Sequence, residues 1–134
     1  MPEITEVLHD IPVEYRHRFQ VLLGREPVAT SILRDILDQY IQTVRKVGPL
    51  VAFINVEEAE LLSTACLALL DHVGRSDSPD EHALVQAAVH YFILEEEDEE
   101  VTEVLGFDDD IQVINAILRA AGRDDLIVPL HRPE

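Results

Sequence analysis

An acidic segment between residues 95 and 110 contains the residue types best suited to bind a charged ligand. It reads EEEDEEVTEVLGFDDD and holds ten carboxylates in sixteen positions, without one basic residue. Clustered carboxylates attract hard cations such as Ca²⁺ and Mg²⁺, and they also attract the Lys and Arg side chains of a partner protein. A solvated loop can have the same composition. The segment is therefore interpreted as a metal site, a docking surface or a plain loop.

The density of like charge favours the docking surface. Like charges at such spacing destabilise a fold by mutual repulsion, and elsewhere in this chain acids are mixed with bases. Val101, Val104, Leu105 and Phe107 recur at helical spacing, which predicts an anchored segment. Among Asp108 to Asp110, we expect one residue to cap the following helix and the others to contribute to partner binding. The acids that we expect to bind a basic protein partner are Glu95, Glu96, Glu97, Asp98, Glu99, Glu100 and Glu103.

The alternative is a metal-binding helical protein, including a metal-dependent enzyme. Its ligands would be Asp98, Asp108, Asp109 and His90, because carboxylate and imidazole groups are common metal ligands. The acidic segment lacks the turn glycine of an EF-hand loop in its place. The leading interpretation therefore includes no metal and no cofactor.

Two Glu-x-x-His pairs have the spacing of di-iron ligands. They are Glu6 with His9 and Glu14 with His17, and Pro12 lies between them. A di-iron centre needs such pairs on two different long helices, with two further glutamates facing them. We therefore expect these residues on the surface, at helix ends.

The sequence offers little for nucleophilic catalysis. It has no Gly-x-Ser-x-Gly motif and no phosphate-binding glycine loop. Cys66, the single cysteine, stands in the charge-free run LLSTACLALL, so a small buried side chain is expected rather than a reactive thiol. A non-enzymatic protein is the favoured interpretation.

The charge of the chain is unevenly distributed. Net charge is −17, and thirteen acids but no Lys or Arg fall between Arg75 and Arg119. Such a field works against binding to nucleic acid or to an anionic membrane. The first ten residues lack the features of a signal peptide, and no charge-free run is long enough to span a bilayer. These observations predict a cytoplasmic protein without nucleic-acid or membrane partners.

Helix start and stop signals predict an all-α fold. Capping residues precede each segment, glycine follows most of them, and no stretch alternates apolar and polar residues as a strand does. The 134 residues suit a single domain, 1–134, with a soft boundary at 74–79. We expect a bundle of about five helices at residues 12–23, 27–48, 55–73, 78–94 and 108–122, and a short extra helix near residues 4–8.

The expected helix at 27–48 has the clearest apolar stripe. Its apolar residues recur every three or four positions, which predicts one wide buried face. Val28, Ile32, Tyr40, Ile41 and Val47 belong to this stripe. The residues expected in the core of the whole protein are Leu33, Ile36, Leu37, Val44, Leu62, Leu69, Leu84, Tyr91, Ile114 and Leu118.

A Tyr-Phe-Ile motif at residues 91–93 is followed by acidic residues and by a Leu-Gly-Phe-Asp-Asp sequence at 105–109. With these motifs, residues 91–122 resemble the bacterial YkvA-type (DUF1232) helical domain. In that family a helix ends in a Tyr-Phe-Ile-like motif, an acid-containing segment follows, and a Leu-Gly-aromatic-Asp-Asp turn starts the next helix. The family has prolines where this chain reads LEEEDEE. The resemblance implies a helical fold and no defined activity. The matching residues are Tyr91, Phe92, Ile93, Asp98, Val104, Leu105, Gly106, Phe107, Asp108 and Asp109.

The sequence thus predicts a non-enzymatic cytoplasmic protein-interaction module of the adaptor, inhibitor or immunity type. Its acidic surface at 95–110 would bind a basic protein. Besides the metal-binding protein, a third interpretation is a structural homodimer formed through an apolar helix face, in which the acidic segment has no binding role.

Overall fold

The structure is a computed structural model that describes residues 2–47, 56–93 and 108–129. The predicted all-α class is confirmed for these residues, although they form six α-helices rather than about five. The sixth is the short helix at the N-terminus. The helices are α1 (Ile4–Asp10), α2 (Val13–Leu23), α3 (Thr30–Val47), α4 (Val56–Gly74), α5 (Pro79–Ile93) and α6 (Asp108–Ala120), followed by the 3₁₀ turn η2 (Asp124–Leu126).

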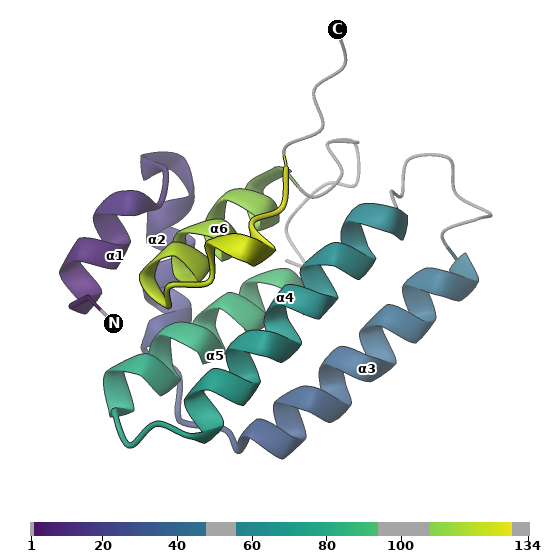
Figure 1. Cartoon of the computed structure of the whole chain (residues 1–134), viewed down its shortest axis with the longest axis horizontal. Coiled ribbons are helices and arrows are strands. Elements are labelled where there is room, and N and C mark those ends of the chain that lie inside the picture. Colours follow the sequence, from purple (N-terminus) through teal and green to yellow (C-terminus); the bar gives the residue numbers. More distant parts are fainter. Residues whose placement is uncertain (1, 48–55, 94–107, 130–134) are drawn as a thin grey trace, which may run out of the picture.

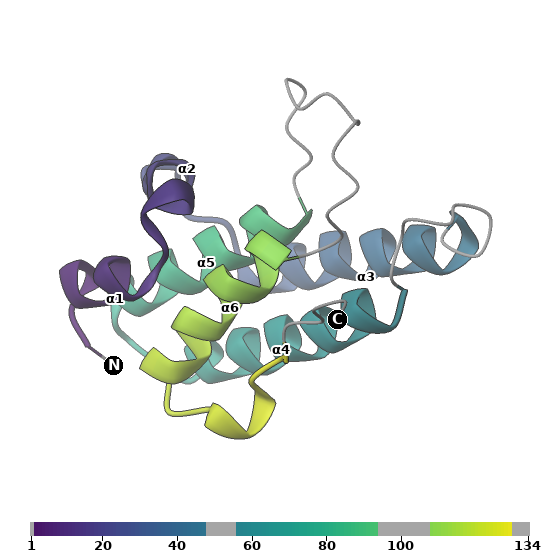
Figure 2. The same cartoon turned by 90° about the horizontal axis from the view of Figure 1, so that it is seen from above.

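Helix α5 is the centre of the bundle. It packs against α2, α3, α4 and α6, while α3 also packs against α4, and α1 packs against α6. Figures 1 and 2 show α3, α4 and α5 lying side by side with roughly aligned axes, and α6 lying against α4 and α5. Every residue of α5 from Leu84 to Ile93 is buried. Buried apolar residues from all six helices form one cluster, which also includes Val128.

Helix α3 begins at Thr30, three residues after the predicted start at Pro27. The cause is Gln86 on α5, whose side-chain oxygen accepts a 2.7 Å hydrogen bond from the Val28 N–H and whose nitrogen donates a 2.8 Å bond to the Glu26 carbonyl. These bonds hold the segment before Thr30 against α5. The first intrahelical acceptor is therefore the Ala29 carbonyl, which accepts from Leu33.

The predicted burial of Ile36 is wrong. Ile36 is 40% exposed, and two other residues of the stripe that was expected to be buried, Ile32 and Val47, are 51% and 41% exposed. Consecutive residues of a helix are about 100° apart around its axis, so Ile36 points well away from the direction of the buried Leu37. Among the described helices, α4 and α5 make the main contacts with α3. These two neighbours cover a smaller part of the circumference of α3 than its apolar stripe occupies. The other nine predicted core residues are buried.

The predicted cap at the start of α5 is confirmed. Ser78 Oγ accepts a 3.3 Å hydrogen bond from the Glu81 N–H, which satisfies one of the free donors of the first turn. Asn55, the first residue of the helix expected at 55–73, lies outside the described residues.

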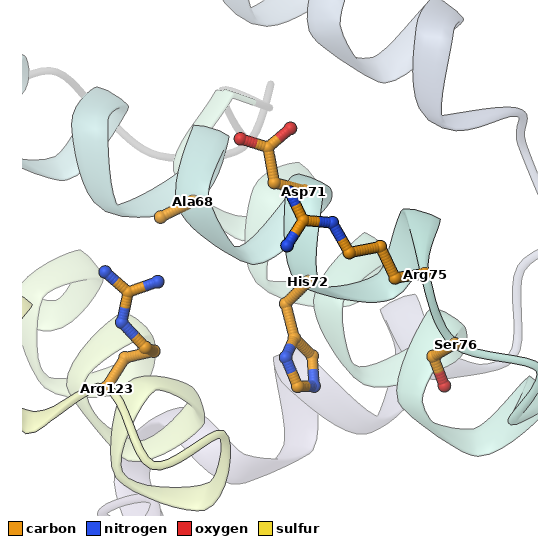
Figure 3. Close-up of a pocket in the computed structure, with 6 residues that line it drawn as sticks. All are labelled: Ala68, Asp71, His72, Arg75, Ser76 and Arg123. Atoms are coloured by element: carbon orange, nitrogen blue, oxygen red, sulfur yellow. The ribbon is translucent and has the colours of Figure 1, made fainter.

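Gly122 ends α6 in a Schellman turn. Its φ of 74° lies in the left-handed region, where a side chain is disfavoured. The Arg123 N–H donates to the Leu118 carbonyl at 2.8 Å, and the Gly122 N–H donates to the Arg119 carbonyl at 3.1 Å. This turn reverses the chain and brings Arg123 back toward the C-terminal end of α4 (Figure 3).

The segment after η2 docks on the core. Val128 is 3% exposed. Asn115 on α6 holds it through two 2.9 Å hydrogen bonds, one to the Val128 carbonyl and one from the Val128 N–H. Among the helices of the described residues, none is both long and apolar enough to cross a membrane.

Candidate functional site

The acidic residues predicted to bind a partner fall outside the described residues. Glu95 to Glu100 and Glu103 all lie within 94–107, the stretch that joins α5 to α6. Both ends of that stretch are described. On one side Ile93, the last residue of α5, is buried, and on the other side α6 begins at Asp108 and packs against α5.

Asp109 fixes the start of α6 to two other helices. Its Oδ2 accepts a 3.2 Å hydrogen bond from the Tyr91 hydroxyl on α5 and lies 3.8 Å from Arg18 Nη1 on α2. The guanidinium carbon of Arg18 is also 4.4 Å from the centroid of the Tyr91 ring. Cation–π and ion-pair contacts thus join three helices at the end of the bundle that carries the acidic segment.

The Tyr91 hydroxyl remains a hydrogen-bond donor at ordinary pH. Burial raises the pKa of Tyr91 well above its usual range, and the charges of Asp109 and Asp110 add to this effect, while Arg18 partly opposes it. Because the protonated hydroxyl is the form that donates to Asp109, the pKa shift and the geometry favour the same state. The Tyr91 hydroxyl therefore holds α6 in position through Asp109 and is not suited to donate a proton to a substrate.

Cys66 is a buried, inert thiol, as predicted. Its side chain is 0% exposed, and burial followed by the charge of Asp110 raises the pKa of Cys66 far above its usual range. A thiol held protonated in the core is a poor nucleophile.

The alternative metal ligands are only partly described. Asp98 lies in the undescribed stretch, and Asp109 is engaged by Tyr91 and Arg18. His90 is 7% exposed, and its Nδ1 atom has no hydrogen-bond partner among the described residues. Burial, followed by the charge of Arg25, lowers the pKa of His90. Within 2–47, 56–93 and 108–129, no three His, Cys, Asp or Glu residues come together to hold a metal ion.

The two Glu-x-x-His pairs lie on the surface, as predicted. Glu6 and His9 on α1 and Glu14 and His17 on α2 are all exposed. They occupy separate short helices at one end of the bundle (Figure 1).

A polar hollow at the C-terminal end of α4 was not predicted. Its volume is about 550 Å³, and it is open to solvent. Figure 3 shows Arg75 and Arg123 approaching from opposite sides, with the His72 ring below Arg75 and the Asp71 carboxylate pointing away from the ring. The lining residues are Ala68, Asp71, His72, Arg75, Ser76 and Arg123.

Most of the charges around this hollow are already paired. Asp71 accepts a hydrogen bond from Arg34 on α3, and Asp125 accepts two bonds of 3.1 Å from Arg123. His72 Nε2 lies 3.1 Å from Glu81 Oε1 on α5. Within the described part of the chain, the Arg75 guanidinium makes no hydrogen bond or ion pair with another side chain.

The sequence contains a weak signal for part of this site. His72 and Arg75 stand at the end of α4, where positive charge offsets the negative end of the helix dipole. Nothing in the spacing links them to Arg123, because that residue reaches the hollow only through the turn at Gly122 and the packing of α6 on α4.

Comparisons with models of protein families, with curated proteins and with solved structures gave no match to this chain. The resemblance of residues 91–122 to the YkvA-type domain stays a prediction. The function of this helical protein must therefore be argued from its own residues.

Proposed function

We propose that this chain is a non-enzymatic protein-interaction module whose acidic segment, residues 95–110, binds a basic protein. The observation that carries the proposal is the fixed position of both segment ends on the bundle. Helix α5 ends buried at Ile93, and α6 is fastened near its first turn by the contacts of Asp109 with Tyr91 and Arg18. A segment whose ends are held loses less conformational entropy on binding than a free tail does.

Charge supplies the attraction for such a partner. Ten carboxylates act over sixteen residues, and no Lys or Arg occurs between Arg75 and Arg119 to offset them. A concentrated field of one sign speeds the encounter with a partner of opposite sign and selects against acidic partners. We further propose a cytoplasmic location, where the single thiol of Cys66 stays reduced.

Charge reversal in the acidic segment tests this proposal. The variant with Glu96, Glu97 and Glu99 replaced by lysine should keep its helical circular dichroism spectrum. It should no longer capture the basic proteins that the wild-type chain recovers from cells of the native host. Each captured protein is then purified, and its affinity for the wild-type chain and for the variant is measured. Binding should also weaken as salt is added, because charge steering is screened.

A matched variant separates the position of the acids from their number. The control residues Glu3, Glu6 and Glu14 are exposed and lie far from the acidic segment in the sequence. Replacing these three glutamates by lysine changes the net charge by the same amount. This control should bind the partner as the wild type does. Equal loss of binding in both variants would show that net charge alone causes the effect. Unchanged binding in the Glu96, Glu97 and Glu99 variant would show that the acidic segment does not take part in the interaction.

One observation favours a homodimer as the second candidate. Ile32 and Ile36 expose apolar surface on successive turns of α3, and a two-fold dimer could bury both on each copy. Native mass by light scattering would show a dimer for the wild type and a monomer after replacement of both residues by glutamate. Val13→Glu is the control, because Val13 is 71% exposed on α2 and lies outside this face.

The metal-binding alternative has a separate test. Elemental analysis of the purified protein would show a stoichiometric bound metal if carboxylates of the acidic segment converge on an ion. A few mM Ca²⁺ would then raise the melting temperature more than monovalent salt of equal ionic strength, because a ligand that binds only the folded state stabilises it.

A further inference from the structure

We propose that the hollow between Arg75 and Arg123 binds a phosphoryl group, as inorganic phosphate or as part of a small phosphorylated molecule. The hollow is built by the end of α4 and by the chain that follows α6. It is formed entirely by described residues, and it does not depend on the acidic segment or on the function proposed for that segment.

Among the described residues, the side-chain charges around the hollow leave one cation that faces only the negative end of the α4 dipole. Arg34 neutralises Asp71, Arg123 neutralises Asp125, and His72 contacts Glu81. Arg75 remains, and its guanidinium has no side-chain partner among the residues that the structure describes. A guanidinium has five N–H donors in a planar fork, which matches two oxygens of a phosphate.

The second arginine is held in place before a ligand arrives. Asp125 accepts hydrogen bonds from both Nε and Nη2 of Arg123, which restricts the guanidinium while its Nη1 donors take no part in those bonds. The backbone below it is fixed by the Schellman turn at Gly122. A positioned donor costs less entropy on binding than a mobile one, so Arg123 is suited to complete a site begun by Arg75.

The arrangement favours a phosphoryl group over a carboxylate. A carboxylate presents two oxygens in one plane and is satisfied by one guanidinium edge. Arg75 and Arg123 approach from opposite sides, and the Ser76 side chain lines the same wall as Arg75 (Figure 3). Donors from separate directions suit a tetrahedral group with three free oxygens. The volume of about 550 Å³ leaves space for a small organic portion beside it.

The carboxylates near the hollow do not close it to an anion. The Asp71 carboxylate points away from His72 in Figure 3 and is bonded to Arg34 on α3. Asp125 accepts hydrogen bonds from the Arg123 guanidinium and is not among the residues that line the hollow. Glu81 is directed to His72 Nε2. Each carboxylate therefore contacts a basic side chain and helps to position it.

Titration of the whole protein with inorganic phosphate tests the proposal. Two-dimensional ¹H–¹⁵N spectra that include the arginine Nε–H signals should be recorded in a cationic buffer, with chloride holding ionic strength constant. We expect saturable shifts for Arg75, Ser76 and Arg123 with phosphate and with sulfate, and weaker binding of acetate. Acetate binding as tight as phosphate would overturn the phosphoryl assignment, and shifts that never saturate would overturn the site.

Two variants assign the effect to the hollow. Arg75→Gln should weaken phosphate binding about tenfold or more, because it removes charge-assisted hydrogen bonds. Arg25→Gln is the matched control: Arg25 is also an exposed arginine, outside the residues that line the hollow, and its loss should leave phosphate affinity unchanged. Equal affinity of the Arg75→Gln variant and the wild type, or equal weakening in both variants, would contradict the proposal.

Discussion

Helices α3 and α5 lie side by side, yet they are buried in different ways. Helix α3 has a wide apolar stripe but buries only part of it, leaving Ile32 and Ile36 exposed. Helix α5 has no exposed side between Leu84 and Ile93, where every residue is buried. The difference shows that burial depends on the number of neighbours, because α5 packs against four helices and α3 against two.

The largest expected effect is the loss of a core leucine from either helix. Leu37 on α3 and Leu84 on α5 are 0% and 1% exposed. Replacement of either by alanine should lower the free energy of unfolding by about 2 to 5 kcal/mol, because each leaves a cavity. Chemical denaturation measures this. A loss under about 0.5 kcal/mol at either site would place that side chain outside the core.

The contact between α5 and the segment that precedes α3 should contribute the next largest effect. Gln86→Ala removes both hydrogen bonds that hold residues 26–29 against α5. We expect the free energy of unfolding to fall by about 1 to 3 kcal/mol, because backbone groups lose their partners. Gln42→Ala is the control, since Gln42 is exposed and its side chain bonds, within the described part of the chain, to Asp38 on its own helix. Equal losses in the two variants would contradict a special role for Gln86.

The burial of α5 also predicts a dependence on pH through His90. Its pKa in the folded state is lowered from 6.5 by burial and by Arg25. The unfolded chain therefore takes up this proton at a higher pH than the folded chain, and stability should fall as pH drops below about 6.5. Denaturation curves between pH 7.5 and pH 5 measure the slope.

Two substitutions isolate the contribution of His90. His90→Gln should make the stability less sensitive to pH in this window, because the buried titrating group is gone. His17→Gln removes an exposed histidine of α2 and should leave the pH dependence as in the wild type. An unchanged slope in the His90→Gln variant would show that other groups control the acid response.

The smallest expected effect comes from the exposed edge of α3. Ile36→Ala should change the free energy of unfolding by no more than about 0.5 kcal/mol, as for most surface substitutions. Leu37→Ala is the natural comparison, because Leu37 is the next residue of the helix and lies on a different side of it. A loss of several kcal/mol at Ile36 in a monomer would show that α3 buries its whole stripe.

Much of the fold could be predicted because its signals are local. The cap at Ser78 and the left-handed Gly122 belong to single turns, whose hydrogen bonds involve neighbouring residues. Helical spacing of apolar residues likewise identified nine of the ten expected core side chains. The acidic segment was recognised in the same way, from composition within sixteen residues.

The site residues outside that segment could not be predicted by such signals. Arg75 and Arg123 line one hollow although they belong to different parts of the chain, and Tyr91 meets Asp109 and Arg18 across three helices. These contacts depend on how α6 packs on α4 and α5. Local periodicity carries no information about that packing.

The sequence by itself determined that the chain forms helices, where most of them end, and where negative charge is concentrated. These properties follow from capping, periodicity and composition, which act within a few turns. The tertiary structure decided which side of α3 is buried, why α3 begins at Thr30, and which arginines share a hollow. Each of these depends on the neighbour that a helix meets, and packing geometry sets that neighbour only when the whole bundle assembles.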